Sequence, residues 1–87
     1  MHLILYSKPG CHLCEGLQEK LTQVQPPIAL EIRDITSRSE WFDAYQYEVP
    51  VLVVVDAQGQ AQTLPRLSPR ASLAQVEQML QKYGLNG

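Results

Sequence analysis

The first part of the chain begins with a short apolar run and continues with a longer amphipathic stretch. Residues 2–7 are almost continuously apolar and are followed by Pro9-Gly10, a pattern typical of a strand covered on both faces. From Cys11 onward, apolar residues recur at the three- and four-residue spacing of one helix face. They are Leu13, Leu17, Leu21 and Val24. Pro26-Pro27 ends this predicted helix, because proline cannot donate the next backbone hydrogen bond.

Residues 28–35 alternate between two sets of side chains, which predicts a half-covered strand. Ile28, Leu30 and Ile32 fall on one side, and Ala29, Glu31, Arg33 and Ile35 fall on the other. A helix that connects two strands of one sheet usually makes a right-handed crossover between parallel strands. The first two strands are therefore expected to form a parallel pair.

A second, shorter helix is predicted to run through residues 41–45. Before it, Ser37-Arg38-Ser39-Glu40 has the spacing of a capping box, in which the serine hydroxyl and the glutamate each satisfy a backbone N–H. We expect Trp41 and Phe42 to anchor this helix in the core, because large aromatic side chains are usually buried.

The second half of the chain predicts a hairpin. Residues 49–55 are rich in valine and indicate a strand. Residues 56–60 are expected to turn, with Gly59 taking the positive φ that such turns use. Residues 61–64 then return as a short antiparallel edge strand.

A last helix follows Pro65, and it starts at Ser72 or at Ser68-Pro69. Its apolar face consists of Leu73, Val76, Met79, Leu80 and Tyr83. Gly84 is the expected C-terminal cap. The order of elements is βαβαββα, which predicts an α/β fold with a four-stranded mixed sheet flanked by helices. The second strand is expected at one edge and the fourth at the other, in a single domain over residues 1–87.

Composition and charge narrow the possible classes of function. The chain has 7 basic and 9 acidic residues and a formal net charge of −2, which argues against a nucleic-acid surface or a polybasic membrane anchor. Its apolar runs are far shorter than the about 20 residues that a membrane helix needs. No secretory leader is recognised after Met1. We therefore expect a soluble, cytoplasmic monomer without nucleic-acid or membrane partners.

Both cysteines lie in one stretch, Lys8-Pro9-Gly10-Cys11-His12-Leu13-Cys14, at the junction of the first strand and the first helix. Structural disulfides rarely persist in a reducing compartment, so catalysis, redox sensing and metal ligation remain as explanations for such a pair. A zinc site wants four ligands, and only His2 and His12 could join the cysteines. No metal is predicted.

The chain resembles the thioredoxin superfamily in its minimal, glutaredoxin-like form. The resemblance rests on the CxxC at the end of the first strand, on Val49-Pro50 opening the third, and on the order of elements. It implies a thiol–disulfide oxidoreductase that acts on protein or small-molecule disulfides. No tightly bound cofactor is expected, and glutathione or a thioredoxin-reductase-like donor would supply the electrons.

The two sulfurs are expected to have different roles. If Cys11 begins the helix, unpaired N–H groups and the positive end of the helix dipole lower its pKa. Cys14 would lie one turn further on and less exposed. Cys11 therefore attacks a disulfide, and Cys14 resolves the mixed disulfide that results. His12 either lowers the Cys11 pKa further as a cation or simply faces solvent.

The resemblance also implies roles for three other residues. The lysine that matches Lys8 favours thiolate and attracts an anionic thiol substrate, although an ordinary solvated lysine is the alternative. The proline that matches Pro50 follows a cis peptide bond and faces the dithiol. The backbone N–H and C=O of Val49 would then be free to pair with an extended substrate. The alternative is a proline that merely starts a strand.

Several positions depart from the glutaredoxin pattern. His12-Leu13 stands between the cysteines instead of Pro-Tyr or Pro-Phe, and Glu48 precedes Val49-Pro50 instead of threonine. Residues 64–68 replace the Gly-Gly turn that helps to hold glutathione, and within them Arg66 and Ser68 are the candidates for substitute contacts. Glutathione use therefore stays open. The alternative functions are an iron–sulfur carrier bridged by Cys11 thiolates of two chains, and a redox sensor without turnover.

Overall fold

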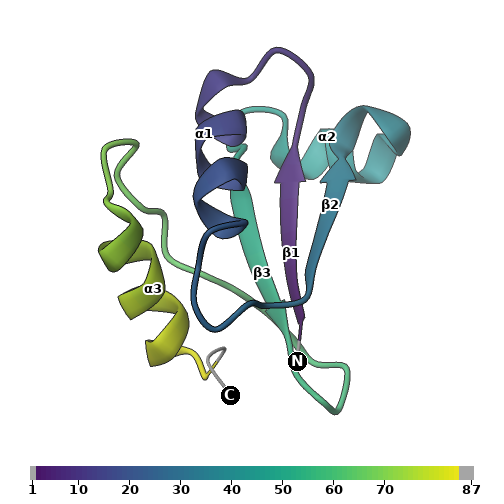
Figure 1. Ribbon diagram of the computed structural model, residues 1–87. Helices are drawn as coiled ribbons and strands as arrows, with labels where there is room; N and C mark the ends of the chain where they lie inside the picture. The colour runs from purple at the N-terminus through teal and green to yellow at the C-terminus, as the bar shows by residue number, and fades with distance from the viewer. Residues whose placement is uncertain (1, 85–87) are drawn as a thin grey trace.

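The computed structural model describes residues 2–84, which form four strands, three α-helices and one 3₁₀ turn (Figure 1). In chain order they are β1 (His2–Ser7), α1 (His12–Leu21), β2 (Leu30–Asp34), the 3₁₀ turn η1 (Ile35–Ser37), α2 (Ser39–Tyr45), β3 (Val51–Val55), β4 (Ala61–Thr63) and α3 (Leu73–Lys82). Within residues 2–84, no helix is long and apolar enough to cross a membrane.

The four strands form one mixed sheet in the order β2-β1-β3-β4. β1 pairs with β2 in parallel and with β3 in antiparallel orientation, and β3 pairs with β4 in antiparallel orientation. The predicted α/β architecture is confirmed, including the parallel first pair and the second and fourth strands at the two edges. Gly59 has a φ of 80° in the β3–β4 turn, as predicted.

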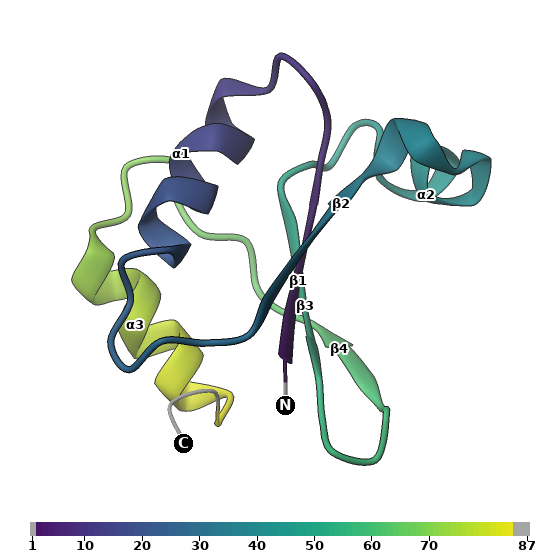
Figure 2. The same ribbon diagram turned by 45° about the vertical axis from the view of Figure 1, so that its right-hand side comes forward.

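The helices cover the two faces of the sheet unequally. Viewed near the edge of the sheet, α1 and α3 lie on one side and α2 lies on the other, close to the ends of β1 and β2 (Figure 2). Successive side chains of a strand point to opposite faces, so β1 supplies Leu3 and Leu5 to one face and Ile4 and Tyr6 to the other.

Two clusters of buried side chains result. The aliphatic cluster, between the sheet and α1 and α3, consists of Leu3, Leu5, Leu21, Val24, Leu52, Val54, Leu64, Val76, Met79 and Leu80. The α2-side cluster consists of Ile4, Tyr6, Cys14, Ile35, Val49, Val51 and Val53. Helix α1 contributes to both, because Leu21 belongs to the first cluster and Cys14 to the second.

Helix α3 begins where one of the two sequence signals indicated. Ser72 is its N-cap, and its hydroxyl accepts a hydrogen bond from the Gln75 N–H over 3.1 Å. The Gln75 side chain accepts in return from the Ser72 N–H over 2.8 Å, which completes a capping box. Gly84 follows the helix with a φ of 80°, and its N–H donates to the Gln81 carbonyl.

Helix α1 is shorter than predicted. It ends at Leu21, before Pro26-Pro27 is reached, and the Thr22 hydroxyl donates to the Glu19 carbonyl. Val24 is nevertheless buried in the aliphatic cluster. Leu13 was expected on the core face but is 47% exposed.

The capping box predicted for α2 is wrong. The Ser37 hydroxyl donates to the Asp34 carbonyl instead, because the chain passes through the 3₁₀ turn before the helix begins. Arg38 is the N-cap of α2 and forms no side-chain cap. Glu40 accepts from the Arg38 guanidinium rather than from the backbone.

Two expectations about burial also need correction. Trp41 is half-buried against the α2-side cluster, with its ring 5.7 Å from that of Tyr6, but Phe42 is 37% exposed and does not anchor the core. Ile32 is exposed as well, although the alternation placed it on a covered face. It lies on β2, which is an edge strand with a neighbour on one side only. Ile35, on the opposite side of the alternation, is fully buried because the chain turns inward there.

Candidate active site

A tight turn carries the chain from β1 to the first cysteine. Pro9 and Gly10 occupy its centre, Gly10 has a φ of 77°, and the Cys11 N–H donates to the Lys8 carbonyl over 3.3 Å. Proline followed by a residue with positive φ is the pattern of a type II turn, which favours glycine at the second position. The turn therefore sets Cys11 at the start of α1.

Cys11 is the N-cap residue of α1. Its sulfur accepts a hydrogen bond from the Cys14 N–H over 3.2 Å, in the manner of a capping serine. Its carbonyl accepts from the Glu15 N–H over 3.1 Å. Once the protein is reduced, the Cys14 N–H and the positive end of the helix dipole favour the thiolate form of Cys11 over the thiol.

Cys11 and Cys14 form a disulfide, with their Cα atoms 5.3 Å apart. The two sulfurs differ in access. Cys14 is 2% exposed and belongs to the α2-side cluster, whereas Cys11 is only partly buried against that cluster. A reactant from solution can therefore approach Cys11 more readily than Cys14.

The segment that faces the disulfide is the loop before β3. The Val49–Pro50 peptide bond is cis, and Val49 is buried in the same cluster as Cys14. The Val49 N–H donates to the Tyr45 carbonyl over 3.1 Å. The expectation of a free Val49 N–H is therefore wrong, because α2 ends at Tyr45 and its last carbonyl takes the N–H groups that follow.

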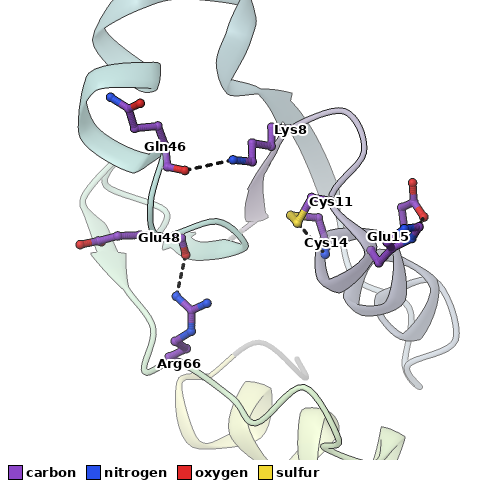
Figure 3. The surroundings of a disulfide bond; sticks show 8 residues. Lys8, Cys11, Cys14, Glu15, Gln46, Glu48 and Arg66 are labelled. Atoms are coloured by element: carbon purple, nitrogen blue, oxygen red, sulfur yellow. Dashed lines mark hydrogen bonds and ion pairs between the residues drawn. A yellow bond between two sulfur atoms is a disulfide. The ribbon is translucent and has the colours of Figure 1, made fainter.

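Two cations hold this loop from opposite sides (Figure 3). The Lys8 ammonium donates to the Gln46 carbonyl over 3.3 Å, and the Arg66 guanidinium donates to the Glu48 carbonyl over 2.7 Å. Tyr47, the residue between Gln46 and Glu48 in the sequence, is 90% exposed. The contact that Lys8 makes in the oxidised protein is thus with the loop backbone.

His12 lies in the first turn of α1 and its side chain is almost fully exposed. Its Nδ1 is 3.5 Å from a carboxylate oxygen of Glu15, so a protonated His12 would form an ion pair on the helix surface. This placement agrees with the solvent-facing alternative.

A cavity of about 510 Å³ opens next to His12 and Leu13, the two residues between the cysteines, although neither cysteine lines it; sequence reasoning missed this cavity. One wall is a stripe of α1, formed by His12, Leu13, Gly16, Leu17 and Lys20. The floor includes Pro50, Val51 and Leu52, and the far wall is the segment of residues 64–69 after β4. Tyr45 also lines it, and burial, more than its neighbours Tyr6 and Glu48, raises the pKa of the Tyr45 phenol. Leu13 and Leu17 were the local signal, and they were assigned together with Leu21 and Val24 to one apolar helix face.

Comparisons with known proteins agree with this arrangement. The chain matches the family model described as "Glutaredoxin-like domain (DUF836)" over residues 2–81. A search of curated proteins gave no match. Among solved structures, the structural genomics target protein XcR50 from X. campestris is 28% identical, with a TM-score of 0.64, over 92% of this chain and 96% of that one.

Thioredoxin 1 from Thermosipho africanus shares the fold at 16% identity, with a TM-score of 0.62 over 95% of this chain and 93% of that one. The family match spans nearly all of the described residues and includes both cysteines. The chain therefore belongs to the family of glutaredoxin-like domains and has the fold of thioredoxin.

Proposed function

We propose that the protein is a thiol–disulfide oxidoreductase that cycles between the Cys11–Cys14 disulfide and a dithiol. The observation that carries the proposal is the unequal placement of the two sulfurs. Cys11 is accessible at the N-cap of α1 and within reach of a backbone N–H, and Cys14 is buried one turn away in disulfide contact with it.

The proposed cycle conserves electrons as follows. The Cys11 thiolate attacks one sulfur of a substrate disulfide, forms a mixed disulfide and releases the first substrate thiol as a thiolate. Deprotonated Cys14 then attacks Cys11 Sγ, which releases the second substrate thiol and forms the Cys11–Cys14 disulfide. The substrate gains two electrons and the protein loses two. An external dithiol, or two monothiols, returns the protein to its reduced form.

The contacts of the segment after β4 favour a dithiol donor over glutathione. The Arg66 guanidinium donates to the Glu48 carbonyl, and the Ser68 hydroxyl accepts from the Arg70 N–H over 3.2 Å. Each side chain thus has a partner within the protein, and although Arg66 keeps a charge that no carboxylate of residues 2–84 pairs, neither residue reproduces the Gly-Gly turn that helps to hold glutathione in glutaredoxins. We expect a thioredoxin-reductase-like protein or a small dithiol to be a better reductant than glutathione.

The test measures reduction of bis(2-hydroxyethyl) disulfide with dithiothreitol as the electron source. Cys11→Ser should lose at least 100-fold in rate, because the nucleophile is gone. In a separate reaction without dithiothreitol, reduced Cys14→Ser should accumulate a mixed disulfide at Cys11, seen by mass spectrometry as one 2-mercaptoethanol group added per chain. Gln18→Ser, on the exposed side of the same helix, should stay within twofold of the wild type.

Equal rates in the wild type and Cys11→Ser would contradict the proposal. A wild-type protein that reacts once with a disulfide but is not turned over by either dithiothreitol or glutathione would be a redox sensor instead. Comparing the two reductants at equal thiol concentration also tests the expected preference for a dithiol.

A further inference from the structure

One stripe of α1 lines the cavity next to the residues between the two cysteines, and of this stripe only Leu17 also packs against the aliphatic cluster. Leu13, Gly16, Leu17 and Lys20 are spaced by three, one and three residues, which places them on one side of a helix. Leu13 is the most exposed leucine among the described residues, although it lies between the two cysteines. An apolar side chain left uncovered next to a reactive disulfide is a candidate for contact with whatever approaches that disulfide.

The opposite wall of the cavity is also mainly apolar. It consists of residues 64–69 and includes Leu64, Leu67, Pro65 and Pro69. Proline has no N–H, so this wall has few backbone donors for a polar ligand. A hydrophilic tripeptide could pair a carboxylate with Arg66, but its carbonyl groups would find few backbone donors on this wall, at a cost in affinity.

Gly16 keeps the cavity open in the middle of the helix stripe. A Cβ built on Gly16 would have no atom within 4 Å, so the space beside the backbone is empty. The volume of about 510 Å³ lies within the range of about 300–1,000 Å³ that is usual for ligand sites. This is enough room for one or two aliphatic side chains.

The charges at the cavity are mainly positive. Lys20 donates to the Ala71 carbonyl and Arg66 to the Glu48 carbonyl. Within residues 2–84, neither cation forms an ion pair with a carboxylate. Glu48 also lines the cavity, but its side chain extends away from the disulfide and from Arg66 in Figure 3. An acidic group on a ligand would therefore find two cations that no carboxylate neutralises.

We propose that this cavity binds the leucine-like side chains next to a substrate's disulfide-bonded cysteine, with an acidic residue of the same peptide against Lys20 and Arg66. The inference rests on the proposed function, because it assigns the substrate class of the Cys11–Cys14 site. The protein would then select acidic, aliphatic peptide disulfides over glutathione disulfides.

Three cysteine peptides test the proposal, each joined to 2-mercaptoethanol as a mixed disulfide. Their sequences are Glu-Leu-Cys-Leu-Glu, Glu-Ser-Cys-Ser-Glu and Lys-Leu-Cys-Leu-Lys, so that either direction of binding presents the same groups. With dithiothreitol as reductant, kcat/KM for the acidic leucine peptide should exceed that for the serine peptide by about tenfold or more. It should also exceed that for the lysine peptide at low salt, and this second difference should shrink as salt screens the charges.

Gly16→Phe tests whether the cavity is responsible. Phenylalanine fills the space beside the helix and suits an α-helix better than glycine does, so the variant should fold cooperatively. Its kcat/KM for the acidic leucine peptide should fall to that for the serine peptide. Gln18→Phe adds the same ring to the exposed side of α1, outside the cavity lining, and should keep the tenfold preference.

A leucine-to-serine ratio of kcat/KM near one in the wild type would overturn the proposal, and so would a tenfold ratio that survives in Gly16→Phe.

A binding measurement without turnover distinguishes a failure of the cavity assignment from a failure of the proposed oxidoreductase function. The same peptides with S-methylcysteine are titrated into the oxidised protein and followed by calorimetry. If no peptide disulfide is reduced but the acidic leucine peptide still binds about tenfold tighter than the serine peptide, the cavity assignment stands and the oxidoreductase proposal falls. If all three disulfides are reduced alike and the S-methyl peptides bind alike, the reverse holds.

Discussion

The two faces of the sheet differ in how completely they are covered and in what they contain. The aliphatic cluster lies beneath two ten-residue helices, and every one of its members is aliphatic or methionine. The α2-side cluster lies beneath a seven-residue helix, and its outer members, including Trp41 and Tyr45, are only partly buried. The buried sulfur of Cys14 and the backbone before Pro50 both belong to this thinner side.

The two faces should therefore differ in what they contribute to the free energy of folding and to the access of solution to the disulfide. Burial of apolar surface stabilises in proportion to the area removed from water, so the face beneath α1 and α3 should contribute most of the free energy of folding. The Cys11–Cys14 pair lies where the cover is incomplete, and Cys11 is only partly buried there. Substitutions on the two faces should therefore have effects of different kinds.

The largest effect is expected from Leu5→Ala. Leu5 is fully buried in the aliphatic cluster, and removing a buried leucine side chain costs about 2–5 kcal/mol. Urea unfolding monitored by circular dichroism measures the change. The rate of disulfide reduction by the folded fraction should stay close to that of the wild type. A cost below about 1 kcal/mol would contradict the assignment of the main core to this face.

Trp41→Ala should have a smaller effect on the free energy of unfolding. A fully buried tryptophan would cost about 3–5 kcal/mol, and the half-buried Trp41 should cost about half as much. Phe42→Ala is the matched control, because Phe42 is the next residue of α2 but lies outside the α2-side cluster. Equal losses in the two variants would show that the α2 cover does not depend on Trp41.

Gly16→Ala should raise the free energy of unfolding by about 1 kcal/mol, because alanine is the better residue in an exposed helix interior. Gly59→Ala is an informative control. A Cβ would meet no atom within 4 Å at either position, but Gly59 has a φ of 80°. Alanine is strained in that conformation, so the same substitution should destabilise the hairpin. If both variants were stabilised, backbone conformation would not be the cause of the difference.

The smallest effect concerns Asp34, which begins the 3₁₀ turn below α2. Hydrogen bonds from the Thr36 hydroxyl and then from the Thr36 N–H lower the pKa of the Asp34 carboxyl. A lowered pKa in the folded state gives stability that is present above the unfolded value, about 3.9, and is lost as pH falls through the folded pKa. Asp34→Asn keeps an oxygen acceptor but does not titrate.

Urea midpoints measured for the wild type and Asp34→Asn from pH 6 to pH 2.5 check this expectation. The wild type should be the more stable protein at pH 6, and the difference should shrink on acidification. A difference that stays constant over the whole range would contradict an origin in the charge of Asp34.

Local signals were enough to predict most of the fold, but the way separate segments meet could not be predicted. The turn at Gly59 was predicted correctly from its neighbours in sequence, and Ser72 was one of the two predicted helix starts. The valine-rich strand was predicted from residue 49 but begins at Val51, after the cis Val49–Pro50 bond.

Leu13 and Phe42 were wrongly placed in the core, because helical spacing identifies a face without showing which part of it is covered. The cavity was missed for the same reason, since it exists only where α1 meets residues 64–69. By contrast, Cys11 and Cys14 could be identified as a candidate redox pair because they are only three residues apart in sequence.

The position of Trp41 makes the protein its own optical probe. It is the single tryptophan of the chain, and the guanidinium carbons of Arg33 and Arg38 each lie 5.0 Å from the centre of its ring. Its emission therefore reports the α2 side of the sheet alone. Fluorescence and far-ultraviolet circular dichroism, recorded on one unlabelled sample, then distinguish loosening around the disulfide from melting of the helices that cover the opposite face.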